Sequence, residues 1–190
     1  MTFAVDPMPE MMSQRLLPAF MPTLPIIDPT CGRYCLKALL KHHFERLTTI
    51  RAPDITLPKP TTRWKDWAAY DPYDDFQLGP QMLRESYDIP GTLQAWEDRL
   101  RQHGPIILAG VLGQASVPHY ILLIGTNTDD GGNFRFKDPL AGDVIGEESF
   151  ASMQSRIGTP IVYARPEIGV VFSAYADLLP SNVLSIVFRN

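Results

Sequence analysis

Two cysteines, Cys31 and Cys35, stand with three residues between them in the stretch DPTCGRYCLKALLKHH, which covers residues 28–43. A zinc site takes four ligands, or three and a water, whereas one such pair supplies two. A disulfide across a single helical turn is strained and closes almost no loop. Two choices remain for the pair. One is a nucleophile beside a packing residue, and the other is two core cysteines, because a free cysteine packs as a small hydrophobic side chain.

The residues around Cys31 distinguish it from Cys35. The segment 28–30, Asp-Pro-Thr, predicts a turn whose last residue caps a helix that starts at Cys31. Unpaired backbone N–H groups and the positive end of the helix dipole favour a thiolate there, and Gly32 leaves room for a substrate backbone. Cys35 lies one turn further on, in line with Leu39, and continues the apolar stripe. We therefore predict that Cys31 is reactive and that Cys35 packs in the core.

A cysteine nucleophile needs a base, and the base needs a side chain that orients it. Three of the four histidines lie in predicted helices (His42, His43 and His103). His119 instead opens the apolar strand HYILLIGT, and the polar turn NTDDGG and the alternating strand NFRFKD follow, which is the pattern of a β-hairpin. The midpoint between His119 and Asp138 falls in that turn, so antiparallel pairing brings the two together. A carboxylate there orients the imidazole; the alternative is that Asp138 only caps a turn.

Composition limits the classes of protein. The chain has 190 residues, of which 45% are hydrophobic, and this suits one globular body with its own core. Its formal net charge of −4 shows no basic bias, so we expect no nucleic-acid partner. The apolar runs are too short to span a bilayer, so we expect no membrane partner. The sequence contains no phosphate-binding glycine loop and no metal-ligand spacing, so we expect no cofactor and no metal.

Four blocks of sequence carry a resemblance to a known family. They are TCGRYCLKALL, LQAWEDRLRQHGPIILAGV, PHYILLIG and FRFKDPLAGDVIGEESF, which extend with a gap from Thr30 to Phe150. In order and spacing they resemble papain-like cysteine peptidases, in particular the bacterial branch that includes double-glycine (bacteriocin-processing) peptidases and papain-like effector proteases. The resemblance implies that Cys31 is the nucleophile, His119 the general base and acid, and Asp138 the residue that orients His119.

The resemblance also implies an α+β protein with the papain-like fold, in which the nucleophile helix packs on a mostly antiparallel sheet. We assign residues 1–27 to an N-terminal arm and residues 28–190 to the papain-like cysteine peptidase domain. Within the domain, residues 51–77 are predicted to form a long irregular loop, and the segment at residues 79–91 a short helix that ends before Pro90. The segments TPIVYARP, IGVVFSAY and NVLSIVFRN predict three strands near the end of the chain.

One position departs from the family pattern. Papain-like enzymes usually place a glutamine about six residues before the nucleophile, where its side chain donates to the oxyanion, and this chain has Pro25 there. The nearest upstream glutamine is Gln14. Three explanations stay open: Gln14 loops back, the Thr30 hydroxyl substitutes, or the enzyme is slow or depends on a partner. The backbone N–H of Cys31 is a donor in each case.

The residues and the resemblance together predict a cysteine protease that cuts a protein or peptide through a thioester acyl-enzyme. Two alternatives stay open: an acyltransferase, transglutaminase or deamidase with the same triad, and a catalytically dead papain-like module that binds peptides. The resemblance to effector proteases further implies a bacterial toxin. Such a toxin would act in the cytoplasm of a target cell after delivery by a specialised secretion system, and an immunity protein would cover its cleft in the producing cell. A housekeeping processing peptidase is the alternative role.

Overall fold

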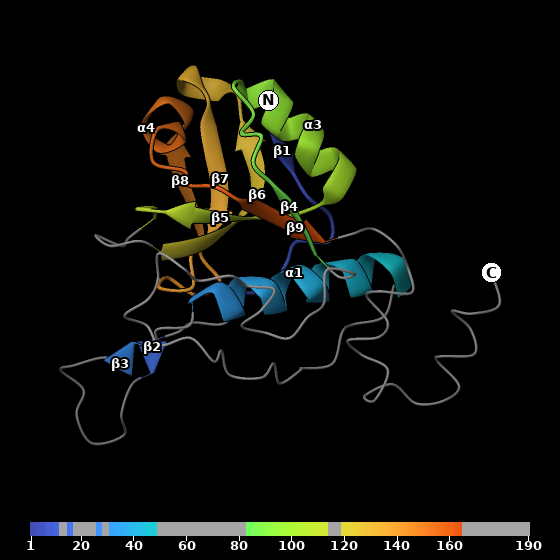
Figure 1. Cartoon of the computed structure of the whole chain (residues 1–190). Helices are drawn as coiled ribbons and strands as arrows, with labels where there is room; N and C mark the ends of the chain where they lie inside the picture. The colour runs from blue at the N-terminus through green and yellow to red at the C-terminus, as the bar shows by residue number, and fades with distance from the viewer. Residues whose placement is uncertain (12–14, 17–25, 28–30, 49–82, 114–118, 165–190) are drawn as a thin grey trace.

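The structure is a computed structural model that describes residues 1–11, 15–16, 26–27, 31–48, 83–113 and 119–164 (Figure 1). The strands are β1 (Thr2–Ala4), β2 (Arg15–Leu16), β3 (Ile26–Ile27), β4 (Leu83–Ser86), β5 (Ile106–Gly110), β6 (His119–Asn127), β7 (Asn133–Lys137), β8 (Ile145–Ser149) and β9 (Ile161–Ala164). The α-helices are α1 (Cys31–Thr48), α3 (Leu93–His103) and α4 (Phe150–Gln154), and a 3₁₀ turn, η2, spans Asp129–Gly131.

One antiparallel sheet forms the centre of the described part of the chain. Its strands follow the order β4-β9-β5-β6-β7-β8, and β1 pairs with β6 beside this path. Each of these pairs is antiparallel, and β2 and β3 form a separate two-stranded sheet. The helices and the mostly antiparallel sheet confirm the predicted α+β class, and the arrangement is consistent with the papain-like fold.

Helix α1 packs on β5, β6 and β9, and α3 packs on β6, as Figure 1 shows. In β6 each residue from Ile121 to Thr126 is buried, so both faces of this strand are covered. In α1 the apolar side chains recur at helical spacing, which turns one stripe of the helix toward the sheet. The side chains of this stripe are at most 1% exposed: Cys35, Leu36, Leu39, Leu40 and Phe44. Hydrophobic burial therefore holds helix α1 in place.

Helix α3 has the ends that the sequence predicts. Thr92 caps its start, because its side-chain oxygen accepts a hydrogen bond from the backbone N–H of Ala95 at 3.2 Å. Gly104 follows its last residue, His103, with a positive φ of 78°. Such a conformation is open to glycine at little cost, and it ends the helix just before strand β5.

At the edge of the sheet formed by β4 and β9, one predicted element is wrong and one is confirmed. Residues 79–91 do not form a helix where the structure describes them; residues 83–86 are strand β4, paired with β9. The short polar segment Leu-Arg-Glu-Ser has no strong preference of its own, so the available edge of β9 decides its conformation. The strand predicted in TPIVYARP is confirmed as β9. The other two predicted strands and the loop at 51–77 lie outside the described residues.

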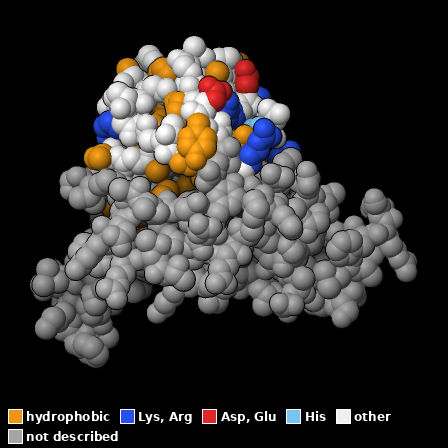
Figure 2. All heavy atoms as spheres, viewed as in Figure 1, with side chains coloured by type: hydrophobic (Ala, Val, Ile, Leu, Met, Phe, Trp, Pro, Cys, Tyr) orange, Lys and Arg blue, Asp and Glu red, His pale blue; other side chains and the backbone are white. Residues whose placement is uncertain are grey.

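The described surface carries charges of both signs. On the face seen in Figure 2, the side chains of Lys and Arg lie near those of Asp and Glu rather than in a separate basic area. Among the residues that the structure describes, no helix combines the length and the apolarity needed to cross a bilayer.

The first eleven residues are attached to the rest of the fold at several points. Strand β1 pairs with the end of β6, and the backbone N–H of Val5 donates to the carbonyl oxygen of Ile124 at 2.9 Å. Val5 and Met11 are buried, at 6% and 3% exposed. The backbone N–H of Met11 donates to the carboxylate of Asp143 at 2.9 Å. The described start of the predicted arm therefore contributes both to the sheet and to the core.

We predict that deletion of residues 1–11 destabilises the protein. The deletion removes the buried side chains of Val5 and Met11, each worth about 1.5–3 kcal/mol, so the expected loss is about 3–6 kcal/mol in the free energy of unfolding. Urea unfolding followed by circular dichroism measures this loss. Deletion of residues 1–2 is the matched control, because both are exposed. Equal stability of the two truncated proteins would contradict the prediction.

Candidate active site

The β6–β7 hairpin places His119 beside Asp138. His119 is the first residue of β6, and Asp138 directly follows the last residue of β7. Their side chains share a hydrogen bond of 2.7 Å between His119 Nε2 and Asp138 Oδ1. Both residues are buried, at 4% and 2% exposed. A buried histidine and carboxylate with one short hydrogen bond between them form a coupled pair with little access to water.

The register of the hairpin differs in detail from simple symmetry. Leu122 pairs with Lys137, and the pairing shifts between Leu123 and Gly125. If this register is continued, Asp138 comes level with Ile121, two residues from His119. Residues two apart along a strand point to the same face, so His119 and Asp138 still face the same side of the sheet. His119 and Asp138 therefore come close together, although they are not directly opposite each other in the hairpin.

The side chain of Cys31 lies beside His119, although it belongs to helix α1 and not to the hairpin. Cys31 is the first residue of α1, its thiol sulfur accepts a hydrogen bond from the backbone N–H of Tyr120 at 3.4 Å, and it is 1% exposed. Hydrogen bonding and charge from Cys31 act on His119 and raise its pKa, so the two side chains lie within interaction distance. Because Asp138 occupies Nε2 of His119, Nδ1 is the ring nitrogen left for the thiol. The three predicted site residues therefore form one chain of contacts.

Asp138 and Cys31 determine the pKa of His119 together with its burial. Burial by itself would lower the pKa of His119, but hydrogen bonds to Asp138 and Cys31, together with their charges, raise that pKa to about 9. The imidazole therefore holds a proton at neutral pH. A protonated imidazole next to a cysteine sulfur is able to donate that proton to a departing amine.

Asp138 is fixed by its own turn. Its Oδ1 also accepts a hydrogen bond from the backbone N–H of Leu140 at 2.8 Å, and its carbonyl oxygen accepts from Ala141 and Gly142, each at 2.9 Å. The carboxylate thus caps the turn after β7 and contacts His119 with the same oxygen. The two interpretations of Asp138 that the sequence allows are compatible, because the turn holds the carboxylate in the position that His119 needs.

Cys35 lies one helical turn after Cys31 but in a different environment. Its side chain is 0% exposed and belongs to the hydrophobic core. Burial raises the pKa of the Cys35 thiol well above its ordinary value, and the nearby charges of Cys31 and Asp138 act in the same direction. Cys35 therefore stays a neutral thiol and packs as a hydrophobic residue.

The other three histidines lie together, away from Cys31. The rings of His42 and His43 meet edge to face with centroids 5.0 Å apart, and the ring of His103 stacks on Tyr163 at 4.2 Å. His42 Nδ1 donates to the carbonyl oxygen of Pro7 at 2.6 Å. Within the described residues, three buried ring nitrogens have no hydrogen-bond partner: His42 Nε2, His43 Nε2 and His103 Nδ1. No group of three or more potential ligands there has the geometry to hold a metal ion.

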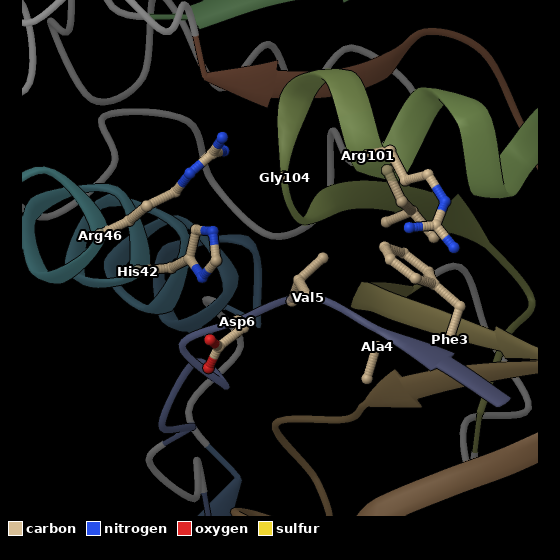
Figure 3. Close-up of a pocket in the computed structure, with 9 residues that line it drawn as sticks. Phe3, Ala4, Val5, Asp6, His42, Arg46, Arg101 and Gly104 are labelled. Carbon is tan, nitrogen blue, oxygen red and sulfur yellow. The ribbon is translucent and has the colours of Figure 1, made fainter.

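A pocket of about 290 Å³ lies next to these histidines (Figure 3). It is enclosed by residues 3–6, by His42 and Arg46 of α1, and by the end of α3. Arg101 lies over the ring of Phe3 at 4.1 Å on the far side of the pocket from Arg46. Arg46 is fifteen residues from Cys31 along α1, roughly 22 Å at the rise of an α-helix. The pocket is therefore separate from the contacts between Cys31 and His119.

Of the oxyanion donors that the sequence suggests, the described residues include the backbone N–H of Cys31. Gln14, Pro25 and Thr30 lie outside the described residues. The backbone N–H of Cys31 stands at the first position of α1, where no carbonyl of the helix accepts it. Two backbone features of the site were not predicted from the sequence. The N–H of Tyr120 donates to the sulfur of Cys31, and the backbone of Gly113 lies against the Asp138 carboxylate. The second of the two glycines in GVLGQAS, Gly113, is the signal that the sequence offers for the second feature.

Comparison with known proteins agrees with the geometry. A family model described as papain-like cysteine protease AvrRpt2 matches residues 84–157, less than half of the chain. The matched stretch includes His119 and Asp138 and does not reach Cys31. No curated protein matches the sequence. The match confirms the resemblance to papain-like cysteine peptidases and supports a protease function.

We predict that His42 and His43 make the protein less stable in mild acid. Burial lowers their pKa values to about 4 and about 3, and the His42 Nδ1 hydrogen bond offsets this only in part. Since the unfolded chain takes up these protons near pH 6.5, their contribution is complete above that pH and is lost as the pH falls. Stability should decrease by about 1.4 kcal/mol per pH unit for each histidine between pH 6.5 and 4.

Urea unfolding at pH 8 and pH 5 measures this decrease in the wild type and in the variant His42→Gln/His43→Gln. The comparison at pH 8 gives the packing cost of the substitutions, so the difference between the two pH values isolates the protons. The slope should flatten in the variant, and an unchanged slope would contradict the prediction. The pH dependence of stability that we expect from His119 has the opposite sign. Its raised pKa contributes stability below pH 6.5 that is lost as the pH rises through about 9.

Proposed function

We propose that this chain is a cysteine protease that cleaves a protein or peptide with Cys31 as nucleophile, His119 as general base and acid, and Asp138 as the orienting residue. The observation that carries the proposal is the placement of three side chains at one buried point: Asp138 and His119 share a 2.7 Å hydrogen bond, and Cys31 beside them raises the pKa of His119. A helix start, a strand start and a strand end supply the three side chains. The family match over residues 84–157 supports the same class.

The mechanism follows from the positions of the protons. The sulfur of Cys31 attacks the carbonyl carbon of the scissile amide, while His119 holds the proton that the thiol gives up. The backbone N–H of Cys31 donates to the negative oxygen that forms. His119 then transfers its proton to the amine, the C–N bond breaks, and a thioester remains on Cys31. Water, deprotonated by His119, attacks the thioester and releases the acid and the free thiol.

Asp138 acts through His119 in this scheme. Its Oδ1 holds Nε2, so the imidazole presents Nδ1 to the sulfur in each step. The carboxylate also stabilises the imidazolium, in agreement with the raised pKa of His119. Since Asp138 is 2% exposed, water competes little for this hydrogen bond.

We predict graded losses when the three residues are replaced. Cys31→Ala and His119→Ala should each lower kcat/KM on a cleaved peptide by about 10⁵–10⁶-fold, because the thioester cannot form without them. Asp138→Ala should cost less, about 10²–10⁴-fold, because it removes orientation but not the nucleophile. Peptide cleavage followed by mass spectrometry measures these losses. A comparison of cellular proteins cut by the wild type but not by Cys31→Ala first identifies the substrate.

Cys35→Ala is the matched control, since it removes a thiol one turn away. It should keep the activity and lower the stability by about 1–2 kcal/mol through a small cavity. An inactive, folded Cys35→Ala together with an active Cys31→Ala would reverse the two assignments. Wild-type activity in Asp138→Ala would assign the orienting role to another residue.

The same experiments separate the alternative classes. An acyltransferase or transglutaminase joins the acyl group to an added amine, and a deamidase leaves the backbone intact with a mass gain at glutamine. A catalytically dead module cuts nothing, and its Cys31 should react with iodoacetamide no faster than an ordinary buried thiol. New termini produced by the wild type support the protease over all three.

We further propose that the protease is a bacterial effector toxin that acts inside a target cell, by the resemblance of its motif blocks to papain-like effector proteases. A reducing cytoplasm keeps the Cys31 thiol available for attack. A cell that makes such an enzyme needs protection, and an immunity protein that covers the cleft is the simplest form. The partners in this proposal are a protein or peptide substrate and this immunity protein.

Expression in bacterial cytoplasm tests the toxin role. The wild type should arrest growth, and Cys31→Ala, made in equal amount, should not, because the damage requires the thioester. Co-expression of small neighbouring genes should identify one that restores growth. Harmless accumulation of an enzyme that demonstrably cleaves peptides would refute the toxin role and favour a processing peptidase.

A further inference from the structure

Gly113 lies against Oδ2 of Asp138, the carboxylate oxygen that does not bond His119. It has a positive φ of 60°, and a Cβ placed on it would lie 2.3 Å from Asp138 Oδ2 and 3.1 Å from its Cγ. Such a distance is far below ordinary contact between a carbon and an oxygen atom. The backbone of Gly113 therefore lies directly against the carboxylate, in space that any other residue would fill with its side chain.

The other oxygen of the Asp138 carboxylate, Oδ1, is fixed by hydrogen bonds. It already accepts two, from His119 Nε2 at 2.7 Å and from the backbone N–H of Leu140 at 2.8 Å. Movement of Oδ2 away from residue 113 rotates or shifts Oδ1 as well, because the two oxygens share one planar group. A side chain at position 113 would therefore break or lengthen the bond to His119.

Three residues directly before Gly113 anchor its segment to the rest of the fold. Gly110, at the end of β5, forms an antiparallel bridge with Ile157, and the carbonyl oxygen of Val111 accepts a hydrogen bond from Arg156 Nη1 at 2.7 Å. The side chain of Leu112 is 0% exposed and packs in the core. These contacts restrain the backbone that leads to Gly113, so a new side chain there would displace the Asp138 carboxylate.

We propose that Gly113 is a positioning residue of the active site: its bare backbone forms the wall that holds the Asp138 carboxylate against His119 and covers it from water. This inference rests on the proposed protease function. The titratable groups that face His119 are Asp138 after β7 and Cys31 at the start of α1, and Cys35 of α1 lies near both. Displacement of Asp138 removes one of the two partners that keep the proton on His119.

The test compares Gly113→Ala with Gly131→Ala. Both glycines have a positive φ, of 60° and 85°, so both variants carry the strain of a side chain in that conformation. A Cβ at Gly131 meets nothing within 4 Å, so this variant isolates the strain from the contact with Asp138. Two quantities are measured in each: kcat/KM on a cleaved peptide, and the rate of alkylation of Cys31 by iodoacetamide between pH 5 and 10, identified by mass spectrometry. Because Cys31 is buried in all variants, the shape of the pH profile is compared rather than the absolute rate.

Gly113→Ala should lower kcat/KM by about 10²-fold, the order expected for a misplacement near 1 Å. Its alkylation profile should shift toward that of Asp138→Ala, whereas Gly131→Ala should keep the profile and the activity of the wild type. A wild-type profile and activity in Gly113→Ala would overturn the inference. A change in activity without a change in the profile would overturn it too, since a merely structural effect does not move the proton of His119.

The double variant Gly113→Ala/Asp138→Ala covers the case in which Gly113→Ala does not fold. Removal of the carboxylate makes room for the new methyl group, so the double variant should fold and match Asp138→Ala in activity and in its profile. Its stability should fall below that of Asp138→Ala only by the amount that Gly131→Ala costs the wild type. A double variant that is much less stable than this, or much less active than Asp138→Ala, would show that the contact with Asp138 is not the cause.

The same data separate this inference from the proposed function. If His119→Ala has the alkylation profile of the wild type, the triad itself is wrong. If His119→Ala differs from the wild type and Gly113→Ala does not, the triad stands and only the role of Gly113 is refuted.

Discussion

The hydrogen bond between His119 and Asp138 depends on burial, and most features of the described fold serve to bury it. A charged pair in water gains little from one hydrogen bond, because water offers both partners equivalent bonds. In this protein the two side chains are 4% and 2% exposed, so little water is available to compete for the hydrogen bond. The turn after β7 and the backbone at Gly113 both lie against the carboxylate of this pair. Burial alone would favour loss of the proton from His119, so the proton stays there at neutral pH because of Asp138 and Cys31.

Helix α1 connects two electrostatic environments of opposite kind. At its first residue, the thiol of Cys31 meets a histidine whose partners raise its pKa to about 9. Near its other end, burial lowers the pKa values of His42 and His43 to about 4 and about 3, and a hydrogen bond at Nδ1 of His42 compensates only in part. Burial disfavours a charged imidazole in both places, so the difference comes from the partners. A carboxylate and a thiol reverse the effect at His119, whereas the other two histidines face each other and Arg46.

The sequence predicted the hairpin because strand symmetry is a local property. Once a turn is recognised between two apolar strands, residues at equal distance from it come together, and His119 and Asp138 do so despite a shift in the pairing near Gly125. A side chain repeats its direction every second residue, so an offset of two leaves the pair on one face. Residues 79–91 were mispredicted as a helix for the opposite reason. Their strand, β4, forms only because β9 presents an open edge, and that edge is nearly eighty residues away in the chain.

The sequence by itself determined which residues have the chemistry for the site and where on their elements they stand. Helix starts, strand starts and turns follow from neighbouring residues, and this is enough to separate Cys31 from Cys35 and His119 from the other histidines. Only the tertiary structure decided that α1 reaches the start of β6, that the backbone N–H of Tyr120 meets the thiol, and that Gly113 lies against Asp138. These contacts join segments far apart in the chain, so their distances depend on how the whole core packs. No local pattern of residues fixes such distances, because each is the joint result of many buried side chains.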